Sequence, residues 1–282
     1  METKKIRIPL FFGMHAEPGQ LLSICAGALP FIILIAGYLY LSHERNLSNP
    51  DEKLMPTPAK IVTAFNQVAF KADVKTGDTI FWHDTGVSLR RLGYAAIISS
   101  VLALWFGMNL ALFKGMNALC MPLLRFSSLV PPPILLPVLF LTVGVEEASK
   151  VVIIVISIAP AMTLAVYGTV SKMAGEQITR SFTLGATQLD VIYRILLPQV
   201  LPRLIEILRT SLGMAWYSLI LAEAIAASSG IGYRIYLVRR FTQMDVIIPY
   251  ALWVVVLGYA MNYILGLILD KCYPWYSKQK EN

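Results

Sequence analysis

Long uncharged apolar runs alternate with short polar segments along this chain. Crossing the hydrocarbon of a membrane takes about 20 apolar residues at roughly 1.5 Å each. Five runs of sufficient length lie between Glu17 and His43, Arg91 and Lys114, Arg125 and Glu146, Lys150 and Lys172, and Asp245 and Asp270. A sixth runs from about Leu204 to Ala227 and is interrupted by Glu223. We therefore expect about six transmembrane helices.

The class of protein follows from these runs and from the composition. Only helices and closed barrels satisfy their backbones in lipid, and the runs are too long and continuous for barrel strands. At 56% hydrophobic and 15% charged residues, the chain of 282 residues is too apolar for an ordinary soluble domain. The pattern predicts an all-α, polytopic integral membrane protein. Its net charge of +7 is dispersed between the helices, so we expect basic residues near lipid and no nucleic-acid partner.

The N-terminal run follows Lys4, Lys5 and Arg7, as the apolar core of a signal peptide would. It is longer than such a core, and no small-x-small cleavage site follows, so we interpret it as an anchor. If both termini are cytoplasmic, 13 of the 24 Lys and Arg residues lie inside, which favours this orientation only slightly. The three cysteines have neither a metal-ligand spacing nor a disulfide pattern.

Three parts are expected along the chain: an N-terminal tail with the anchor in residues 1–50, an external segment in 51–85, and a membrane core in 86–282. In the external segment, Thr57 and Pro58 form a helix start, with threonine as N-cap and proline at the first helical position. Apolar side chains then fall on one face, which predicts a helix on the membrane surface.

Prolines open the third predicted span. Pro131, Pro132 and Pro137 remove backbone donors and disturb helix geometry, so we expect an extended or kinked entrance. Irregular backbone at membrane depth persists only when it is buried in protein or lines a water-filled path. A translocation path and a simple helix entrance at the interface remain two interpretations of this segment.

A polar segment from Ile178 to Pro198 separates two apolar runs. Gly185 is placed to close one short helix in a left-handed conformation, and Thr187 with Asp190 resembles a capping box that opens a second. Prolines at 198 and 202 are expected to separate that helix from the next span. Such a hairpin suits docking into a groove on a cytoplasmic partner, whereas an amphipathic linker on the lipid surface is the alternative.

The same segment resembles the signature of permease subunits of ATP-binding-cassette (ABC) importers, in which Gly185 is followed after nine residues by the run 195–198, Ile-Leu-Leu-Pro. Further motifs are similar to the nitrate, sulfonate, taurine and bicarbonate branch. These are Pro131-Pro132 with Pro137, Gly144 to Lys150, Leu212 to Trp216, Ala222 to Ala226, Gly230-Ile231-Gly232, and Phe241 with Asp245. One departure is Thr179-Arg180-Ser181, where the family usually has Glu-Ala-Ala, so the usual acidic contact to the ATPase is missing and Arg180 is expected to reverse its sign.

The resemblance implies a type I (MetI-like) importer transmembrane domain with coupling helices at about 176–198. It assigns ATPase coupling to Thr179, Arg180, Ser181, Gly185, Thr187, Asp190, Ile195, Leu197 and Pro198. Implied partners are a second copy of the chain, two cytoplasmic ABC ATPase subunits, an external solute-binding protein and the bilayer of a bacterial inner membrane. The chain has no phosphate-binding loop of its own, so we expect no bound cofactor here and ATP-Mg on the partner subunits. The branch suggests a small anion as solute.

Glu223 is an acidic residue inside a predicted span, which costs on the order of 2.5–3.5 kcal/mol at mid-bilayer. One interpretation places it at the dimer interface near an external gate, together with Pro131 and Pro132 on the translocation path. In the other it reaches water or pairs with one of three nearby arginines, which are Arg234, Arg239 and Arg240. Trp216, two turns earlier, either lines the path or packs in the core.

Other classes of protein are less well supported by the sequence. An intramembrane enzyme would need a nucleophile, a metal site or an acid–base pair at membrane depth, and the three histidines lie outside the spans. A secondary transporter would carry ionisable residues at mid-membrane, where this chain has almost none. A membrane scaffold or receptor subunit is the remaining alternative, and it would show no ATP-driven accumulation of solute.

Overall fold

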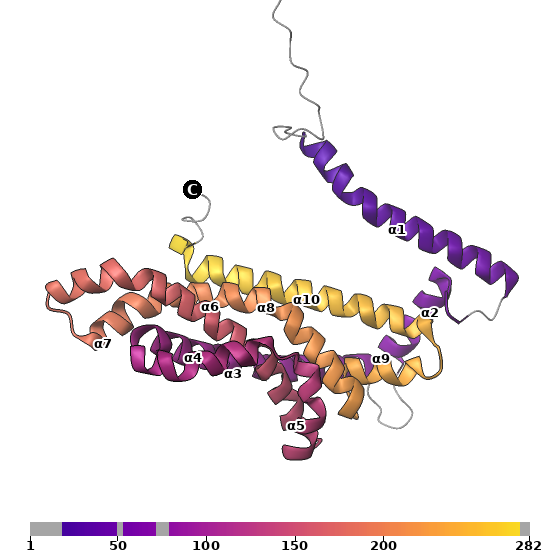
Figure 1. Cartoon of the computed structure of the whole chain (residues 1–282). Coiled ribbons are helices and arrows are strands. Elements are labelled where there is room, and N and C mark those ends of the chain that lie inside the picture. The colour runs from indigo at the N-terminus through magenta and orange to yellow at the C-terminus, as the bar shows by residue number, and fades with distance from the viewer. Residues whose placement is uncertain (1–18, 50–52, 72–78, 277–282) are drawn as a thin grey trace, which may run out of the picture. The chain divides into compact units, whose positions relative to one another are not determined.

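The computed structural model describes residues 19–49, 53–71 and 79–276, with the backbone alone for 174–178. Every regular element of these described residues is a helix (Figure 1). The elements are α1 (Gln20–Ser48), α2 (Pro58–Phe70), α3 (Ile80–Leu112), α4 (Lys114–Leu129), the 3₁₀ helix η1 (Pro132–Leu135), α5 (Leu136–Thr142), α6 (Glu147–Thr183), α7 (Gln188–Asp190), the π-helix η2 (Val191–Leu196), α8 (Leu197–Ala226), α9 (Ile231–Arg239) and α10 (Met244–Cys272). The expected all-α fold is confirmed.

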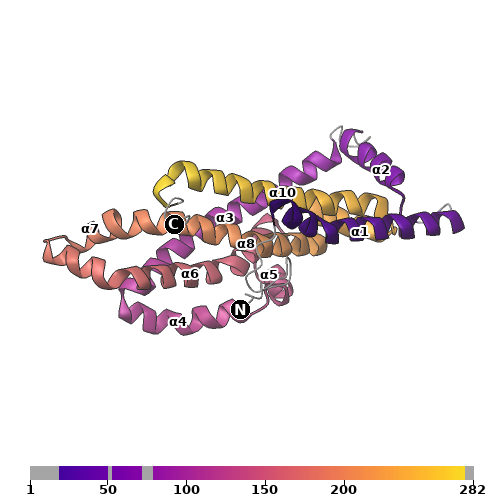
Figure 2. The same cartoon turned by 90° about the horizontal axis from the view of Figure 1, so that it is seen from above.

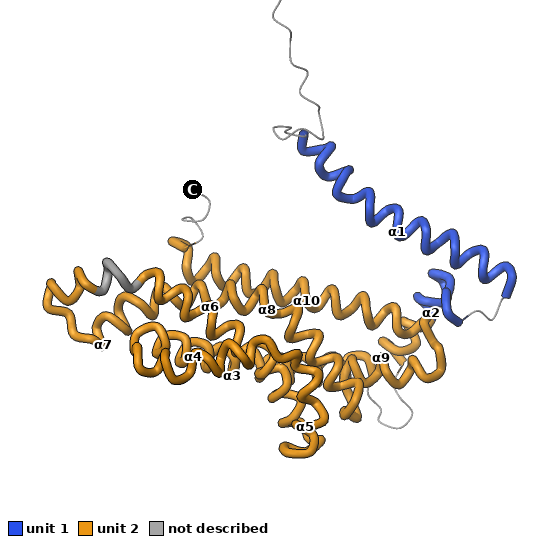
Figure 3. The backbone as a smooth tube through the Cα atoms, viewed as in Figure 1, with its two compact units in different colours: residues 1–63 blue, residues 64–282 orange. Residues whose placement is uncertain are grey.

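The chain divides into two compact units, residues 1–63 and 64–282, which Figure 3 colours separately. In the first unit, the segment before α2 is tied to the C-terminal third of α1. The Tyr38 hydroxyl donates to the Pro56 carbonyl at 2.7 Å, and the Asn46 amide donates to the Met55 carbonyl at 2.8 Å. The backbone N–H of Lys60 donates to Thr57 Oγ1 at 3.4 Å, which confirms the predicted start of α2.

The second unit is a bundle in which α3, α6 and α8 pack together and α10 runs beside α8 (Figures 1 and 2). Lipid provides no hydrophobic force between helices, so close packing and interhelical polar contacts hold such a bundle. Gly107 on α3 shows this closeness, since a Cβ there would lie 2.6 Å from a methyl carbon of Val166 on α6. Fully buried apolar residues of this core include Leu92, Ile154, Met162, Val166, Leu196 and Leu219.

The number of clearly apolar spans is smaller than predicted. Among the described residues, four helices are long and apolar enough to cross a membrane, namely α1, α3, the part of α6 up to Met173, and α10. The bent pair of α4 with η1 and α5 would make a fifth. The predicted sixth span exists as α8, but this helix carries Arg203, Glu206, Arg209 and Glu223, and it is too polar to be counted with the others.

The third predicted span, between Arg125 and Glu146, is wrong as one continuous helix. The helical chain starts earlier, at Lys114, and α4 ends at Leu129. After the extended residue Pro131, η1 and α5 continue in a direction bent by 97° from α4. The prolines cause this break because three consecutive residues there have no N–H to donate to a helix. The expectation of an extended or kinked entrance is thereby confirmed.

Candidate functional site

The turn between α6 and α8, residues 179–198, is called the coupling turn below, and it begins with a Schellman motif. Gly185 has a φ of +85°, which glycine adopts without a steric penalty. Its N–H donates to the Phe182 carbonyl at 3.0 Å, and the N–H of Ala186 donates to the Ser181 carbonyl at 3.1 Å. These two bonds satisfy carbonyls left over at the end of α6. The predicted role of Gly185 in closing a helix is confirmed.

The capping box predicted at the start of the next helix is present. The backbone N–H of Asp190 donates to Thr187 Oγ1 at 3.3 Å, and the N–H of Thr187 donates to Asp190 Oδ2 at 3.2 Å. The Thr187 hydroxyl also donates to that carboxylate oxygen. These hydrogen bonds, with Arg194 3.4 Å away, hold the pKa of the Asp190 carboxyl below its usual range.

The two short helices expected here are not separate elements. The first is the end of α6, which continues without a break for 37 residues from Glu147 to Thr183. The second passes through the π-helix η2 directly into α8, so Pro198 and Pro202 do not separate it from the span. Pro198 is the second residue of α8 and directly follows η2, so its missing N–H falls at the junction of the two helices. The wider turns of the π-helix change the pattern of backbone hydrogen bonds just before Pro198, and this accommodates the N–H groups that the prolines lack.

Several apolar side chains of the coupling turn are exposed. Leu184 at its tip is 88% exposed and Leu189 is 65% exposed. Phe182 lines a groove of about 290 Å³ with Leu112 and Phe113 at the junction of α3 and α4. Of the other predicted coupling residues, the exposed ones are Thr179, Arg180 and Pro198, and the half-buried ones are Ser181, Ile195 and Leu197. Exposed apolar residues on a structured turn suit contact with a partner protein or with lipid.

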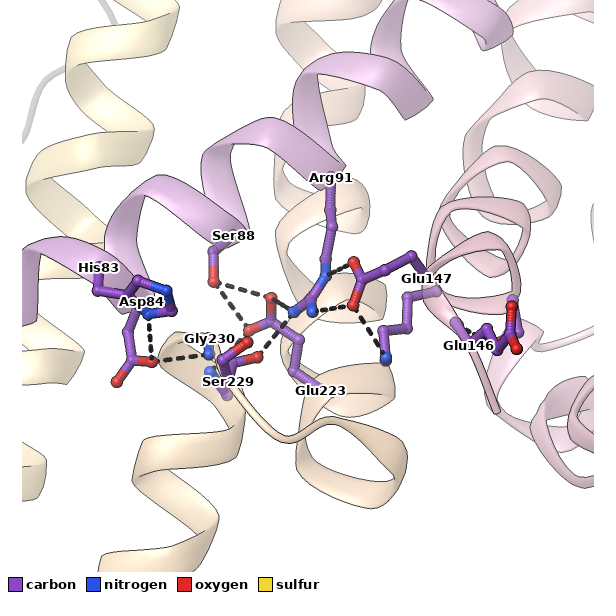
Figure 4. Close-up of polar contacts among 12 residues, drawn as sticks. His83, Asp84, Ser88, Arg91, Glu146, Glu147, Glu223, Ser229 and Gly230 are labelled. Atoms are coloured by element: carbon purple, nitrogen blue, oxygen red, sulfur yellow. Dashed lines mark hydrogen bonds and ion pairs between the residues drawn. The ribbon is translucent and has the colours of Figure 1, made fainter. Parts of the chain in front are cut away.

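The opposite end of the bundle holds a buried cluster of charged residues (Figure 4). Arg91 on α3 lies between two carboxylates. It donates to Glu223 on α8 at 2.8 Å and to Glu147 at the start of α6 at 2.5 and 2.6 Å. Lys150 adds a second cation 3.3 Å from Glu147. Arg91 is 1% and Glu223 0% exposed, so α3 and α8 are joined through fully desolvated groups, whereas the Glu147 carboxylate that ties α6 to Arg91 is 54% exposed.

The start of α9 completes the cluster. The backbone N–H of Gly232 donates to Glu223 Oε2 at 2.8 Å, and the N–H of Gly230 donates to Asp84 Oδ1 at 2.9 Å. Ser88 accepts from Ile231 N–H and donates to Glu223. Carboxylates thus occupy the positive end of α9, where free N–H groups point. Three cations (Arg91, Lys150, Arg234) face three carboxylates (Asp84, Glu147, Glu223), so the cluster is neutral.

This arrangement explains motifs that the sequence displayed without a physical reason. A Cβ at Gly230 would lie 2.6 Å from the Glu223 carboxylate, and one at Gly232 would lie 2.4 Å from the Ile220 carbonyl oxygen. The segments 144–150, 222–226 and 230–232 therefore meet at one place. Sequence reasoning missed Arg91, Asp84 and Ser88 as members of it. The expected pairing of Glu223 with Arg234, Arg239 or Arg240 is wrong, because Arg91 is its partner and Arg234 pairs with Asp84 at 2.8 Å.

The residues predicted for the translocation path lie in three places. Pro131 and Pro132 line a cavity of about 290 Å³ between the α4–η1 junction, α6 and α8. We call it the hydroxyl pocket, because its polar side chains are those of three serines and a tyrosine, which are Ser127, Ser128, Ser157 and Tyr217. Trp216 is 6% exposed, beside Gly258 of α10, and Glu223 is in the buried cluster. Their assignment to the path stays a prediction.

Comparison with known proteins gives the class of this chain. Residues 92–277 match the family described as binding-protein-dependent transport system inner membrane component. The match covers more than half of the chain, so the chain belongs to this family, whose members are permease subunits of ABC importers.

Individual relatives agree with this class. The taurine transport system permease protein TauC of Escherichia coli (strain K12) is 24% identical over 201 residues, which are 71% of this chain and 73% of that relative. A putative aliphatic sulfonates transport permease protein, SsuC of Bacillus subtilis (strain 168), is 24% identical over 222 residues, 79% and 78% of the two chains. In fold, the chain is similar to a chain of the inward-facing MetNI methionine ABC transporter. The TM-score is 0.59 at 19% identity, covering 68% of this chain and 95% of that one.

Proposed function

We propose that this permease imports a small organosulfonate or a similar small anion, and that a separate ATPase drives it through the coupling turn. One observation carries the proposal. The long helices α6 and α8 share an exposed, rigidly capped turn at one end and a buried ionic cluster at the other. A force applied to the turn is therefore transmitted along two continuous helices, each starting or ending in the cluster.

Docking of the ATPase rests on the exposed residues of the coupling turn. Leu184 and Leu189 supply apolar contacts, while the exposed Arg180 and the half-buried Asp190 supply charge at the rim. The fixed caps at Gly185 and Thr187 keep these side chains in one arrangement, which lowers the entropy lost on docking. In this proposal two copies of the chain pair, each receives one ATPase subunit that binds ATP-Mg, and an external binding protein delivers the solute.

The solute path follows the open face of α8. Arg203, Thr210, Met214 and Tyr217 recur at helical spacing and are all exposed, between the sides that pack on α6 and α10. Polar and charged residues in a span face a partner or water instead of lipid. With Pro131 and Pro132 in the hydroxyl pocket, this face forms the wall of the path. Glu223 and Trp216 do not line this wall; they fix the position of α8 through buried contacts on its other sides.

We place the coupling turn in the cytoplasm, at a bacterial inner membrane. With that turn inside, α8 leads outward to α9, and α10 returns inward, so the C-terminus is cytoplasmic. The ionic cluster then lies on the external side, near the binding protein. Helix α3 would then begin on the external side, so an α1 that spans the membrane would run outward and its start would be cytoplasmic as well.

The substrate class rests on the relatives that transport taurine and aliphatic sulfonates. Nitrate and bicarbonate are the other small anions of the branch. The test is uptake of radiolabelled taurine and ethanesulfonate by proteoliposomes that hold this permease with its ATPase and its binding protein. We expect ATP-dependent accumulation of at least one of the two. Accumulation of neither, with the ATPase active, would contradict the substrate class, and failure of the permease to assemble with any ATPase would favour a scaffold or receptor subunit.

A further inference from the structure

A second cavity, of about 300 Å³, lies between α8 and α10 on the coupling-turn side of the hydroxyl pocket. It opens next to the open face of α8, since Arg203 and Thr210 belong to both. We call it the arginine pocket, and its lining residues are Arg203, Glu206, Ile207, Arg209, Thr210 and Asn262. Its two arginines and one glutamate leave a net charge of +1 in a small space.

The charges of this pocket are not equally matched. Arg203 donates to Glu206 Oε2 at 2.6 Å, and the hydroxyl of Tyr276 donates to the same oxygen at 2.8 Å. Arg209 instead donates through Nε to the neutral amide oxygen of Asn262 at 2.9 Å. In the described part of the chain, no carboxylate lies within ion-pair distance of Arg209. The excess positive charge of the pocket is therefore that of Arg209.

Depth in the helix makes this unmatched cation costly. Arg209 follows Leu197, the first residue of α8, by twelve positions in a helix of 30, or roughly 18 Å along roughly 45 Å. A charge so far into a span is expensive unless it meets water or an anion, and such residues mark solute pathways by default. Helix α10 makes room for the guanidinium, since a Cβ at Gly266 would lie 3.3–3.5 Å from its carbon and both terminal nitrogens.

We propose that Arg209 binds a sulfonate or phosphate group in the arginine pocket. A guanidinium presents a planar fork of donors that matches two oxygens of such a group. Asn262 accepts from Nε and so orients the guanidinium, and its amide nitrogen is a further donor for the anion. The pocket volume accommodates a small anion but not a large one.

Two sources could supply this group. One is the transported solute, which would move from the hydroxyl pocket along the open face of α8 to Arg209; this source rests on the proposed function. The other is the phosphate of an anionic lipid in the inner leaflet, since basic pockets between helices on the cytoplasmic side bind such headgroups. The chemistry at Arg209 is the same in both cases.

The test measures how fast the thiol of a Thr210→Cys variant reacts with a charged maleimide, read as the mass of its own peptide so that the native cysteines do not interfere. The importer complex is placed in phosphatidylcholine nanodiscs. We expect methanesulfonate or inorganic phosphate to slow the reaction about tenfold, the effect of about 1.4 kcal/mol of binding. Dimethyl sulfone, which is neutral and of similar shape, is expected to have no effect.

Matched variants assign the protection to Arg209. Arg209→Gln removes its charge, and Gly266→Val displaces its guanidinium with the charge intact, so both should abolish protection. Arg90→Gln removes an exposed charge elsewhere and should leave it unchanged. The thiol of Tyr217→Cys lies on the same face of α8 but in the hydroxyl pocket. Its rate of reaction with the maleimide should not change when phosphate is added.

The outcomes separate the sources and the two proposals. Shielding of the thiol by phosphatidylglycerol alone, without added anion, supports the site with lipid as its source, whereas shielding only by soluble anions supports the solute. An equal reaction rate under all these conditions overturns the inference, even if taurine uptake is normal. Protection by methanesulfonate without uptake of either sulfonate leaves the Arg209 site standing and removes the proposed substrate class.

Discussion

At the scale of single residues, one arginine connects most of the conspicuous motifs of this chain. Arg91 serves Glu223 and Glu147 at once and also donates to the Ser229 carbonyl at 2.8 Å. A buried charge pair is weak evidence for stability, but removing one partner leaves the other charge desolvated. Any arrangement of α3, α6, α8 and α9 that separates these charges would leave one of them buried without a partner. The cluster therefore favours a single geometry of the four helices.

Replacing Arg91 by methionine is expected to destabilise the protein by about 3–5 kcal/mol, because Glu223 is left buried without its cation. In detergent this should lower the midpoint of thermal unfolding by on the order of 10 °C. Arg90→Met is the matched control, because the Arg90 side chain, next to Arg91 in the sequence, is exposed. The unfolding midpoint of this variant should not change. An equal midpoint in both variants would show that the cluster contributes nothing to stability.

Gly232→Ala tests the close contact between α9 and α8. Its new methyl would lie 2.4 Å from the Ile220 carbonyl oxygen, so the backbone must shift at a cost of about 1–3 kcal/mol. Gly86→Ala on α3 meets nothing within 4 Å and should be neutral or slightly stabilising. Thermal unfolding of both variants gives the comparison, and an unchanged midpoint for Gly232→Ala would contradict the packing of these two helices.

The sequence alone indicated some of these residues and not others. Glu223 stands out because an acid in an apolar run is rare, and the glycines stand out because they belong to a recognisable motif. Their partner Arg91 looked like the boundary of a span, and Glu223 is 132 positions away from it. A helical pattern gives the face of a residue but no contact at that separation, so the arginines that follow Glu223 in the sequence were the wrong choice.

At the scale of elements, the coupling turn is determined by local chemistry, which is why it was predictable. Gly185, Thr187 and Asp190 satisfy their own backbone within a few residues, and no distant partner is needed. The α4–η1–α5 segment was harder to predict. The prolines signalled a break, but the absence of any charged residue from 126 to 145 concealed that the chain turns by 97° there.

Gly185→Val should abolish coupling without preventing membrane insertion. A β-branched residue at a φ of +85° costs roughly 1–2 kcal/mol and disfavours the Schellman turn that presents Leu184. We expect ATP-driven uptake to fall about tenfold or more. Gly185→Asn is the control, because asparagine tolerates the left-handed conformation and should retain most of the uptake. Normal uptake by the valine variant would remove the coupling assignment of this turn.

The capping box also predicts a pH dependence. The pKa of Asp190 is lowered in the folded turn, so its contribution is complete above the ordinary value of about 3.9 and is lost only as pH falls through the lowered value. Carboxyl-carbon NMR should place its titration below the ordinary range, and Thr187→Val should raise the midpoint towards it. A midpoint at or above the ordinary value would contradict the box. Between pH 6 and 8 this turn should not change.

At the scale of the whole molecule, the second unit has two functionally different ends. The coupling turn carries exposed apolar residues held by local caps, and the ionic cluster carries buried charges held by contacts between distant segments. Between them α8 presents a polar open face that a span facing only lipid would not carry. Composition and periodicity predicted the membrane class, and the resemblance predicted the permease, but neither showed that α8 itself is too polar to count as an ordinary span.

The most direct test of the account is purification of the tagged chain from its native membrane in mild detergent, with partners identified by mass spectrometry. The intact chain is compared with one in which residues 179–190 are replaced by a Gly/Ser linker, and thermal unfolding checks that the bundle remains folded. We predict that an ATPase with a phosphate-binding loop accompanies the intact chain and is lost with the linker. Retention of the ATPase by the linker variant would contradict docking at the coupling turn, and absence of an ATPase from both samples would contradict the ATP-driven importer.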